Sequence, residues 1–176
     1  MQTYIILIRG VTPTGKNRVP MVELRTALHA AGLHNVNTYI QSGNVLAQSE
    51  LEPTALEQLV HNVIADQFGG DLTILARTPE EHDAVLAGNP FGVEETKRLY
   101  FTQLASEPEP ERLQEFLALD FAPDQVRVAG KVIYTLYADK YSSSKINNNF
   151  FERKLKVRAT TRNFNTMTRL ADMAKA

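Results

Sequence analysis

Cysteine is absent from this chain of 176 residues. Its absence excludes disulfide bonds, thiolate metal ligands and a cysteine nucleophile. The chain also lacks any apolar run close to the roughly 20 residues that a membrane span requires. Its N-terminus has neither the basic lead nor the small-residue cleavage site of a signal peptide. We therefore expect a cytoplasmic protein with no membrane partner.

Histidines are few and scattered, which argues against a metal site. None of them has the H-E-x-x-H spacing of a zinc site. They fall in different predicted elements, at His29, His34, His61 and His82. Ser42 lacks the G-x-S-x-G elbow that exposes a serine nucleophile. We therefore assign no metal, no cofactor and no catalytic residue from the sequence.

Charge is unevenly spread along the chain, although the formal net charge is only −1. Residues 1–45 carry a net charge of +3, residues 46–124 carry −12, and residues 125–176 carry +8. Such segregation fits an anionic partner for the basic ends. It fits equally a fold in which the acidic middle neutralises those ends, and the sequence leaves both alternatives open.

The first half of the chain is predicted to form a βαββαβ unit. Apolar, β-rich stretches predict strands, and apolar residues at helical spacing followed by glycine predict helices. The predicted strands are 3–8, 36–41, 45–47 and 72–76, and the predicted helices are 20–31 and 54–68. This order of elements is that of a ferredoxin-like domain.

The second half is predicted to form another α+β subdomain, which ends in two helices. The predicted strands are 98–103, 125–129 and 132–137, and the predicted helices are 79–86, 110–119, 144–155 and 163–174. Thr78 is the predicted N-cap of the first of these helices. The βαββα order repeats that of the first half without its final strand. The predicted fold is therefore α+β, with subdomains at 1–78 and 79–176 that share an interface.

The loop after the first predicted strand comes close to a phosphate-binding P-loop. Gly10, Gly15 and Lys16 have the spacing of G-x-x-x-x-G-K-[ST], but Asn17 stands where a hydroxyl would ligate Mg²⁺. Pro20 predicts that the helix begins several residues after Lys16, so we predict no P-loop hydrolase. A polar surface loop and an anion-contacting loop of another kind both remain open. The basic and polar candidates in this loop are Arg9, Lys16, Asn17 and Arg18.

Two segments near the C-terminus contain more polar side chains than core packing needs. They are residues 141–149 and 158–165. Ser144 and either Thr160 or Thr161 are predicted N-caps of the last two helices. A cation near a helix N-terminus, such as Lys145 or Arg162, opposes the helix dipole unless an anion is bound there. These segments therefore predict either an anion site or a solvated basic face.

Five motifs, in order along the chain, resemble the signatures of a widespread bacterial family, the domain of unknown function 1697 family. They are Arg9-Gly10, Gly15-Lys16-Asn17-Arg18-Val19-Pro20-Met21, Tyr39-Ile40-Gln41-Ser42-Gly43-Asn44-Val45, Ser144-Lys145-Ile146-Asn147-Asn148 and Ala159-Thr160-Thr161-Arg162-Asn163. The resemblance covers essentially the whole chain. It implies an α+β fold with ferredoxin-like elements and no established activity. The family has a more glycine-rich loop where this chain reads Val11-Thr12-Pro13-Thr14.

We expect the basic loops and helix starts to bind an anionic ligand, either a phosphate-bearing small molecule or a nucleic acid. Cations such as Lys16 and Arg18 would neutralise its charge, and hydroxyls such as that of Ser144 would donate hydrogen bonds. The expected ligand-binding residues are Arg9, Lys16, Asn17, Arg18, Gln41, Asn44, Ser144, Lys145, Asn148, Thr160, Thr161, Arg162 and Asn163. A small enzyme using the same surface and a structural or interaction module without a ligand are the alternatives. The oligomeric state is left open.

Overall fold

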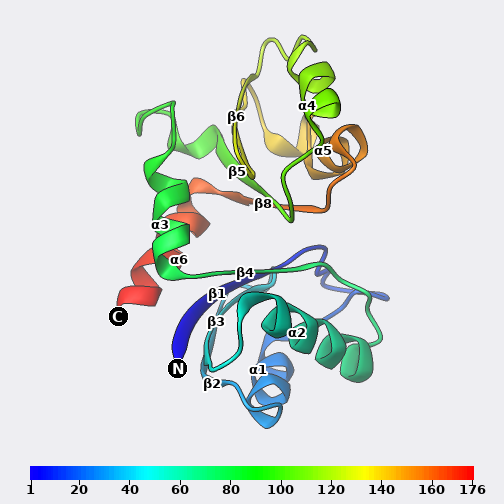
Figure 1. Ribbon diagram of the computed structural model, residues 1–176, viewed down its shortest axis with the longest axis vertical. Coiled ribbons are helices and arrows are strands. Elements are labelled where there is room, and N and C mark those ends of the chain that lie inside the picture. The colour runs from blue at the N-terminus through cyan, green and yellow to red at the C-terminus, as the bar shows by residue number, and fades with distance from the viewer. The chain divides into compact units, whose positions relative to one another are not determined.

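The chain folds into two units, each with its own sheet. A computed structural model describes all residues from Met1 to Ala176, and Figure 1 shows its helices and strands. One unit consists of Met1–Ala84 together with Arg169–Ala176, and the other of Val85–Thr168. The predicted subdomain boundary after residue 78, with an interface between the subdomains, stays a prediction. None of the helices is both long enough and apolar enough to cross a membrane.

The first unit is built on an antiparallel sheet with the strand order β2-β3-β1-β4. Its strands are β1 (Gln2–Ile8), β2 (His34–Tyr39), β3 (Asn44–Ser49) and β4 (Ile74–Arg77), and its helices include α1 (Met21–Ala30) and α2 (Pro53–Phe68). The apolar run at the start of the chain forms the central strand β1, because a strand covered on both faces requires apolar residues at successive positions. The βαββαβ order predicted for this half is confirmed.

Different helices cover the two faces of this sheet. Ile6 of β1 packs in a core with Leu24 of α1 and Val60 of α2, and Figure 1 shows these two helices on one face. Ile5 points to the opposite face, since side chains alternate along a strand. There it packs with Leu170 of α6 (Phe164–Lys175). The sheet is therefore buried on both sides within this unit.

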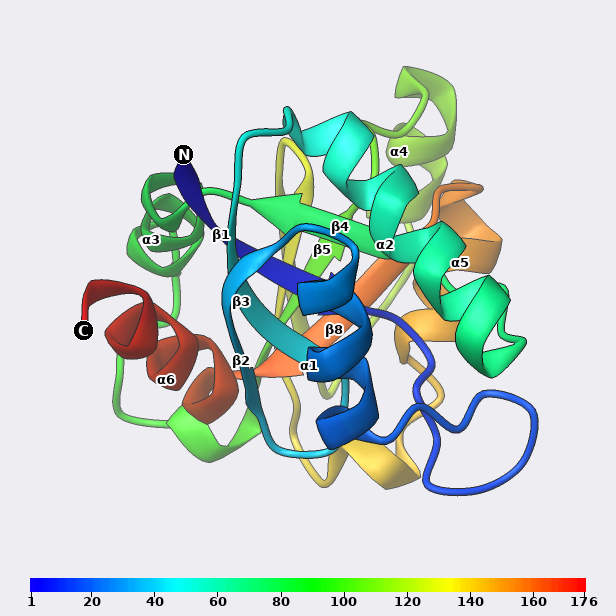
Figure 2. The same ribbon diagram turned by 90° about the horizontal axis from the view of Figure 1, so that it is seen from below.

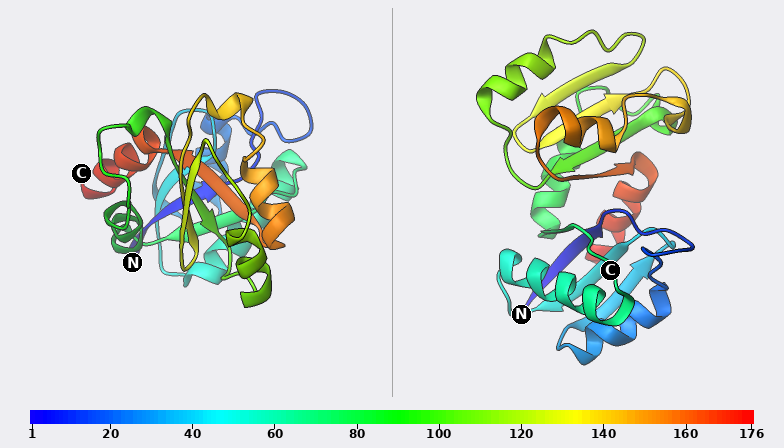
Figure 3. Two further views of the ribbon diagram at one scale, coloured as in Figure 1. Left: turned by 90° about the horizontal axis from the view of Figure 1, so that it is seen from above. Right: turned by 90° about the vertical axis from the view of Figure 1, so that its right-hand side faces the viewer.

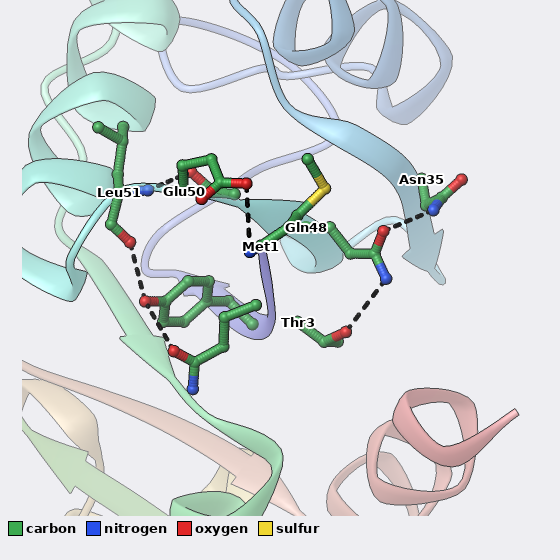
Figure 4. A network of polar contacts seen from close by, with 9 residues as sticks. Met1, Thr3, Asn35, Gln48, Glu50 and Leu51 are labelled. Carbon is green, nitrogen blue, oxygen red and sulfur yellow. Dashed lines mark hydrogen bonds and ion pairs between the residues drawn. The ribbon is translucent and has the colours of Figure 1, made fainter.

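Polar contacts connect the strands of the first sheet at the edge where β1 starts and β3 ends (Figure 4). The terminal amine of Met1 lies 3.1 Å from a carboxylate oxygen of Glu50. The side-chain amide of Asn35 donates to Gln48 Oε1 at 2.6 Å, and Gln48 Nε2 donates to Thr3 Oγ1 at 3.5 Å. These contacts join β1 to β3, and β3 to the edge strand β2, at one end of the sheet.

The second unit contains another antiparallel sheet, with the strand order β6-β7-β5-β8. Its strands are β5 (Leu99–Leu104), β6 (Gln125–Ala129), β7 (Val132–Leu136) and β8 (Ala159–Asn163), and its longer helices are α4 (Pro110–Leu117) and α5 (Asn148–Leu155). Two short 3₁₀ helices are η1 (Thr96–Arg98) and η2 (Tyr141–Ser143). Phe116 of α4 and Phe151 of α5 pack together against this sheet, with ring centroids 5.9 Å apart, and Figure 3 shows both helices beside it. The α+β class is confirmed for both halves.

The end of the chain differs from the sequence-based prediction, because a strand separates the last two helices. The sequence predicts either Thr160 or Thr161 as the N-cap of the last helix, but both residues lie in β8, which pairs with β5. The caps are instead Asn147, whose Oδ1 accepts from Phe150 N at 3.0 Å, and Asn163, whose Oδ1 accepts from Thr166 N at 2.9 Å. The second unit thus has the same βαββαβ order as the first, and the final strand thought to be missing is present.

The chain segment that connects β4 to β5 begins with α3 (Pro79–Ala87). Thr78 Oγ1 accepts from the amide of Glu81 at 3.1 Å, and the Glu81 carboxylate accepts from the amide of Thr78 at 2.9 Å. This reciprocal pair is a capping box, which satisfies two amides at the start of a helix. The predicted N-cap at Thr78 is confirmed.

Candidate functional site

The loop between β1 and α1, residues 9–20, folds back on itself and is called the β1–α1 loop below. The amide of Thr12 donates to Asn17 O at 3.0 Å, and the amide of Arg18 donates to Gly15 O at 3.2 Å. Lys16 therefore lies at the tip of a turn, five positions before α1 begins at Met21. A P-loop needs its lysine at the start of the following helix, so this loop does not have P-loop geometry. Figure 2 shows the loop extending away from its sheet.

The turn between β2 and β3 braces the end of this loop. Gln41 donates through Nε2 to Val19 O at 2.7 Å, and its Oε1 accepts from Met21 N at 3.4 Å. One side chain thus satisfies a carbonyl before α1 and an amide in its first turn. Such a contact fixes the angle at which the chain enters the helix. Gln41, a predicted ligand residue, has a structural role in the loop.

Asn44 and Gly43 stabilise the same turn through hydrogen bonds. Asn44 is fully buried, and its Nδ2 donates to Tyr39 O at 3.1 Å and to Ser42 Oγ at 2.9 Å. Gly43 has a φ of 82°, and its carbonyl accepts from Ile8 N at 2.8 Å. A Cβ added to Gly43 would lie 2.7 Å from Ile8 O and 2.9 Å from Ile8 Cβ. The turn therefore packs directly against the end of β1, where the β1–α1 loop starts.

Ile40 in this turn is held in an unfavourable backbone conformation. Its φ is 50°, and its side chain is 55% exposed. A β-branched residue is disfavoured there, because the left-handed region costs roughly 1–2 kcal/mol. We expect Ile40→Gly to raise the free energy of unfolding by up to about 1 kcal/mol, since the relieved strain exceeds the entropy that glycine adds to the unfolded chain. Urea unfolding measures this change in the free energy of unfolding. Ile40→Val keeps the branched Cβ and should give no increase. An equal increase in both variants would show that the backbone of Ile40 is not strained.

Two cations of the β1–α1 loop, Lys16 and Arg18, have no side-chain partner in the protein. Lys16 and Arg18 are exposed, and their side chains form no hydrogen bond or ion pair. The half-buried Arg9 donates its amide to Thr73 O at 2.9 Å, and its side chain also has a contact. Asn17 is half-buried, and its carbonyl accepts from Thr12 N at 3.0 Å. Among the cations predicted as ligand residues in this unit, Lys16 and Arg18 are thus the two whose side chains form no hydrogen bond or ion pair.

Asn148 joins the two C-terminal motifs in the second unit. Its Nδ2 donates to Ala159 O at 3.0 Å, and its Oδ1 accepts from Thr161 Oγ1 at 2.8 Å. Thr161 Oγ1 also lies 2.8 Å from Thr102 Oγ1 across the β5–β8 pair. The first residue of α5 is thereby tied to the edge strand β8. The structure brings these predicted ligand residues together, and they satisfy one another.

Arg162 bonds to its own strand. Its Nη1 donates to Thr160 Oγ1 at 2.7 Å and to Thr161 O at 2.9 Å. Burial lowers the pKa of Arg162 to about 10, and nearby Tyr141 opposes that shift. Burial disfavours a charged group unless partners compensate it, so this guanidinium depends on its hydrogen bonds. Asn163 is used as the cap of α6.

Ser144 and Lys145 line a pocket of about 410 Å³ that is not uniformly basic. The Ser144 hydroxyl accepts from Ile146 N at 3.0 Å, within its own loop and not as a helix cap. Lys145 is exposed and has no ion pair. The same pocket contains Asp120, Asp124 and Asp139. No group of three or more histidine or acidic side chains in the chain is arranged to hold a metal ion.

A second pocket in this unit contains residues that sequence reasoning did not select. It measures about 520 Å³ and is lined by Lys97, Arg98, Tyr100, Ala138, Asp139, Lys140, Tyr141 and Ser142. Tyr141 and Ser142 fall in a segment noted for polarity, but Tyr100 reads simply as a strand residue. Alternation along a predicted strand gave no sign that its ring would meet Tyr141, because that contact joins residues 41 positions apart.

Comparison with known proteins gives a family and a fold. The chain is similar to a solved structure described as a conserved bacterial protein, SP0830, from Streptococcus pneumoniae, with 23% sequence identity, 98% of each chain covered and a TM-score of 0.77. No match was found among curated proteins. A family model described as protein of unknown function (DUF1697) matches residues 1–134, about three quarters of the chain. The predicted family is thereby confirmed, and the chain belongs to the DUF1697 family.

Proposed function

We propose that the protein binds an anionic, phosphate-bearing ligand or nucleic acid through the β1–α1 loop, and that it does so in the cytoplasm. The observation that carries this proposal is a braced loop with unneutralised cations at its tip. Gln41 and Gly43 hold the two ends of the loop, whereas the side chains of Lys16 and Arg18 have no partner in the protein. Exposed charges add little to stability, so folding alone does not account for this arrangement.

The backbone at the tip supports the same proposal. The amides of Lys16 and Asn17 form no hydrogen bond within the protein, since the turn is closed by the amides of Thr12 and Arg18 instead. Free amides beside basic side chains suit an oxyanion, which accepts hydrogen bonds from both. Arg18 can bind two phosphate oxygens through its planar guanidinium, whereas Lys16 acts as a point charge.

The alternative of a structural module fits the motifs of the second unit better. Asn148 and Thr161 join α5 to β8, as a structural brace would, and Arg162 bonds within its own strand. Their side chains would have to exchange these bonds for a ligand. We therefore centre the proposal on Lys16 and Arg18. The enzyme alternative has no specific observation in its favour.

A direct binding experiment tests the proposal. Labelled single-stranded and double-stranded oligonucleotides and pyrophosphate are titrated with the protein at low salt, and anisotropy or calorimetry measures the dissociation constant. We expect the double variant Lys16→Ala/Arg18→Ala to weaken binding about 10- to 100-fold, because a charge-assisted hydrogen bond is worth about 1.5–3 kcal/mol before screening. Failure of all three probes to bind at low salt would refute the proposal.

Matched variants distinguish the loss of these two cations from a change in net charge and from a loosened loop. Lys154→Ala removes an exposed cation of α5 and should leave binding unchanged. Gln41→Ala keeps both cations but removes the brace to Val19 and Met21. It should weaken binding less than the double variant, since a looser loop must be ordered on binding. Equal losses in Lys154→Ala and the double variant would mean that only net charge matters.

A further inference from the structure

The tyrosine-lined pocket of about 520 Å³ in the second unit has features of a binding site. Tyr100 and Tyr141 are stacked, with ring centroids 4.7 Å apart and an angle of 14° between their planes. The buried Tyr137 meets both rings edge-on, with centroids 5.3 Å from each. Both stacked rings are only partly buried, and both belong to the pocket wall. The stacked pair thus forms part of the wall of a pocket whose volume is within the range of small-molecule sites, about 300–1,000 Å³.

This wall is fixed before any ligand arrives. The hydroxyl of Tyr141 accepts from the amide of Asn148 at 3.1 Å, and that of Tyr137 donates to Ile146 O at 2.7 Å. Arg98 joins the two sides of the pocket, because its carbonyl accepts from Tyr137 N at 2.9 Å and its Nη1 donates to Ala138 O at 2.7 Å. A site whose side chains are already held loses less entropy on binding.

Polar groups at the rim are left unused by the fold. Lys97 and Lys140 are exposed, and neither ammonium group has a hydrogen bond or an ion pair. The hydroxyl of Tyr100 also has no hydrogen-bond partner. Asp139 is the one carboxylate of the lining, and Arg98 is already paired with Glu95 at 2.6 Å. The free charges of the lining are therefore two cations and one anion.

We propose that this pocket binds a nucleobase that carries a phosphate, either as a free nucleotide or within a single strand of nucleic acid. The base would lie against the Tyr100–Tyr141 pair, since every base has a flat face that stacks on aromatic rings. Lys97 and Lys140 would bind its phosphate. The inference does not rest on the β1–α1 loop, which belongs to the other unit.

Tyrosine fluorescence gives a direct test, because the chain has six tyrosines and no tryptophan. Titration with AMP, and separately with a short oligodeoxyadenylate, should quench the emission in a saturable way. Quenching by AMP identifies a free nucleotide as sufficient, and quenching by the oligonucleotide alone identifies the single strand. No saturable quenching or binding by either probe at low salt overturns the inference.

Variants then test the two parts of the site separately, namely the lysines that would bind the phosphate and the tyrosines that would stack on the base. Lys97→Ala/Lys140→Ala should weaken binding about tenfold or more, which corresponds to at least about 1.4 kcal/mol. Tyr100→Leu should have a similar effect, whereas Tyr100→Phe keeps the ring and should bind about as well as the unaltered protein. Circular dichroism confirms that each variant is folded. Lys131→Ala, at the exposed β6–β7 turn, is the charge control. Equal binding by all of these variants overturns the inference.

Two comparisons keep the inference distinct from the proposed function. Inorganic phosphate should compete with AMP only weakly, because it has no ring, and equal competition would overturn the role of the tyrosines. Lys16→Ala/Arg18→Ala should leave AMP binding unchanged. If that variant abolishes AMP binding and the pocket variants do not, the inference fails while the β1–α1 loop proposal stands.

Discussion

Gly43→Ala should destabilise the protein by about 3 kcal/mol or more, which is the largest loss we expect from a single added methyl group. Gly43 has a φ of 82°, where a residue with a Cβ pays roughly 1–2 kcal/mol. The added Cβ would also lie 2.7 Å from the backbone oxygen of Ile8. Neither that carbonyl nor the central strand β1 can move cheaply, and overpacking of this kind typically costs about 1–3 kcal/mol.

Gly15→Ala is the matched control for this substitution. Gly15 has nearly the same φ, 81°, but no atom lies within 4 Å of the position that a Cβ would take. It should therefore lose only the conformational cost of about 1–2 kcal/mol, partly offset by the lower entropy of the unfolded chain. Urea or thermal unfolding of both variants measures the difference. Equal losses of unfolding free energy in the two variants would show that Gly43 does not pack tightly against Ile8 of β1.

Asn148→Ala should cost about 2–3 kcal/mol, because it removes two hydrogen bonds between α5 and β8. The substitution leaves the carbonyl of Ala159 without this donor and the hydroxyl of Thr161 without this acceptor. Leaving a buried polar group unsatisfied costs about 1–3 kcal/mol. Urea unfolding, followed by far-UV circular dichroism, measures the loss.

A double-mutant cycle shows whether Asn148 and Thr161 act together. Thr161→Val removes the hydroxyl that lies between Asn148 and Thr102. We expect the combined variant to cost less than the two single variants added together, since residues in one network are coupled by about 0.5–3 kcal/mol. Strict additivity would contradict the network and would leave Asn148 available for a ligand.

The sequence was sufficient for most elements because their signals are local. Apolar runs predicted β1 and β4, and the helices α2 and α3 begin at Pro53 and Pro79, where proline costs no hydrogen bond. The strand β8 was missed for the opposite reason. Hydroxyl residues at Thr160 and Thr161 are typical of a helix cap, and only pairing with β5 makes them a strand. Sequence pattern carries no record of that distant partner.

In the candidate site, too, contacts between residues far apart in the sequence could not be predicted. Composition and turn signals correctly placed Lys16 in a loop ahead of the helix, and a missing hydroxyl at Asn17 argued against a P-loop. The brace from Gln41 to Val19 joins residues 22 positions apart, whereas the sequence led us to expect a ligand contact for Gln41. Tyr100 gave no signal at all, because its stacking partner follows two further strands. Local chemistry can be predicted from sequence, whereas which polar groups satisfy one another depends on the fold.

The salt dependence of binding tests the central claim most directly, namely that Lys16 and Arg18 contact phosphate. For a single-stranded oligonucleotide, each phosphate neutralised contributes about −0.7 to the slope of log K against log salt concentration. We predict that Lys16→Ala/Arg18→Ala makes the slope shallower by about 1.4 relative to the unaltered protein, while Lys154→Ala leaves it unchanged. A double variant with an unchanged slope would contradict the account, because the two cations would then lie away from the bound phosphates.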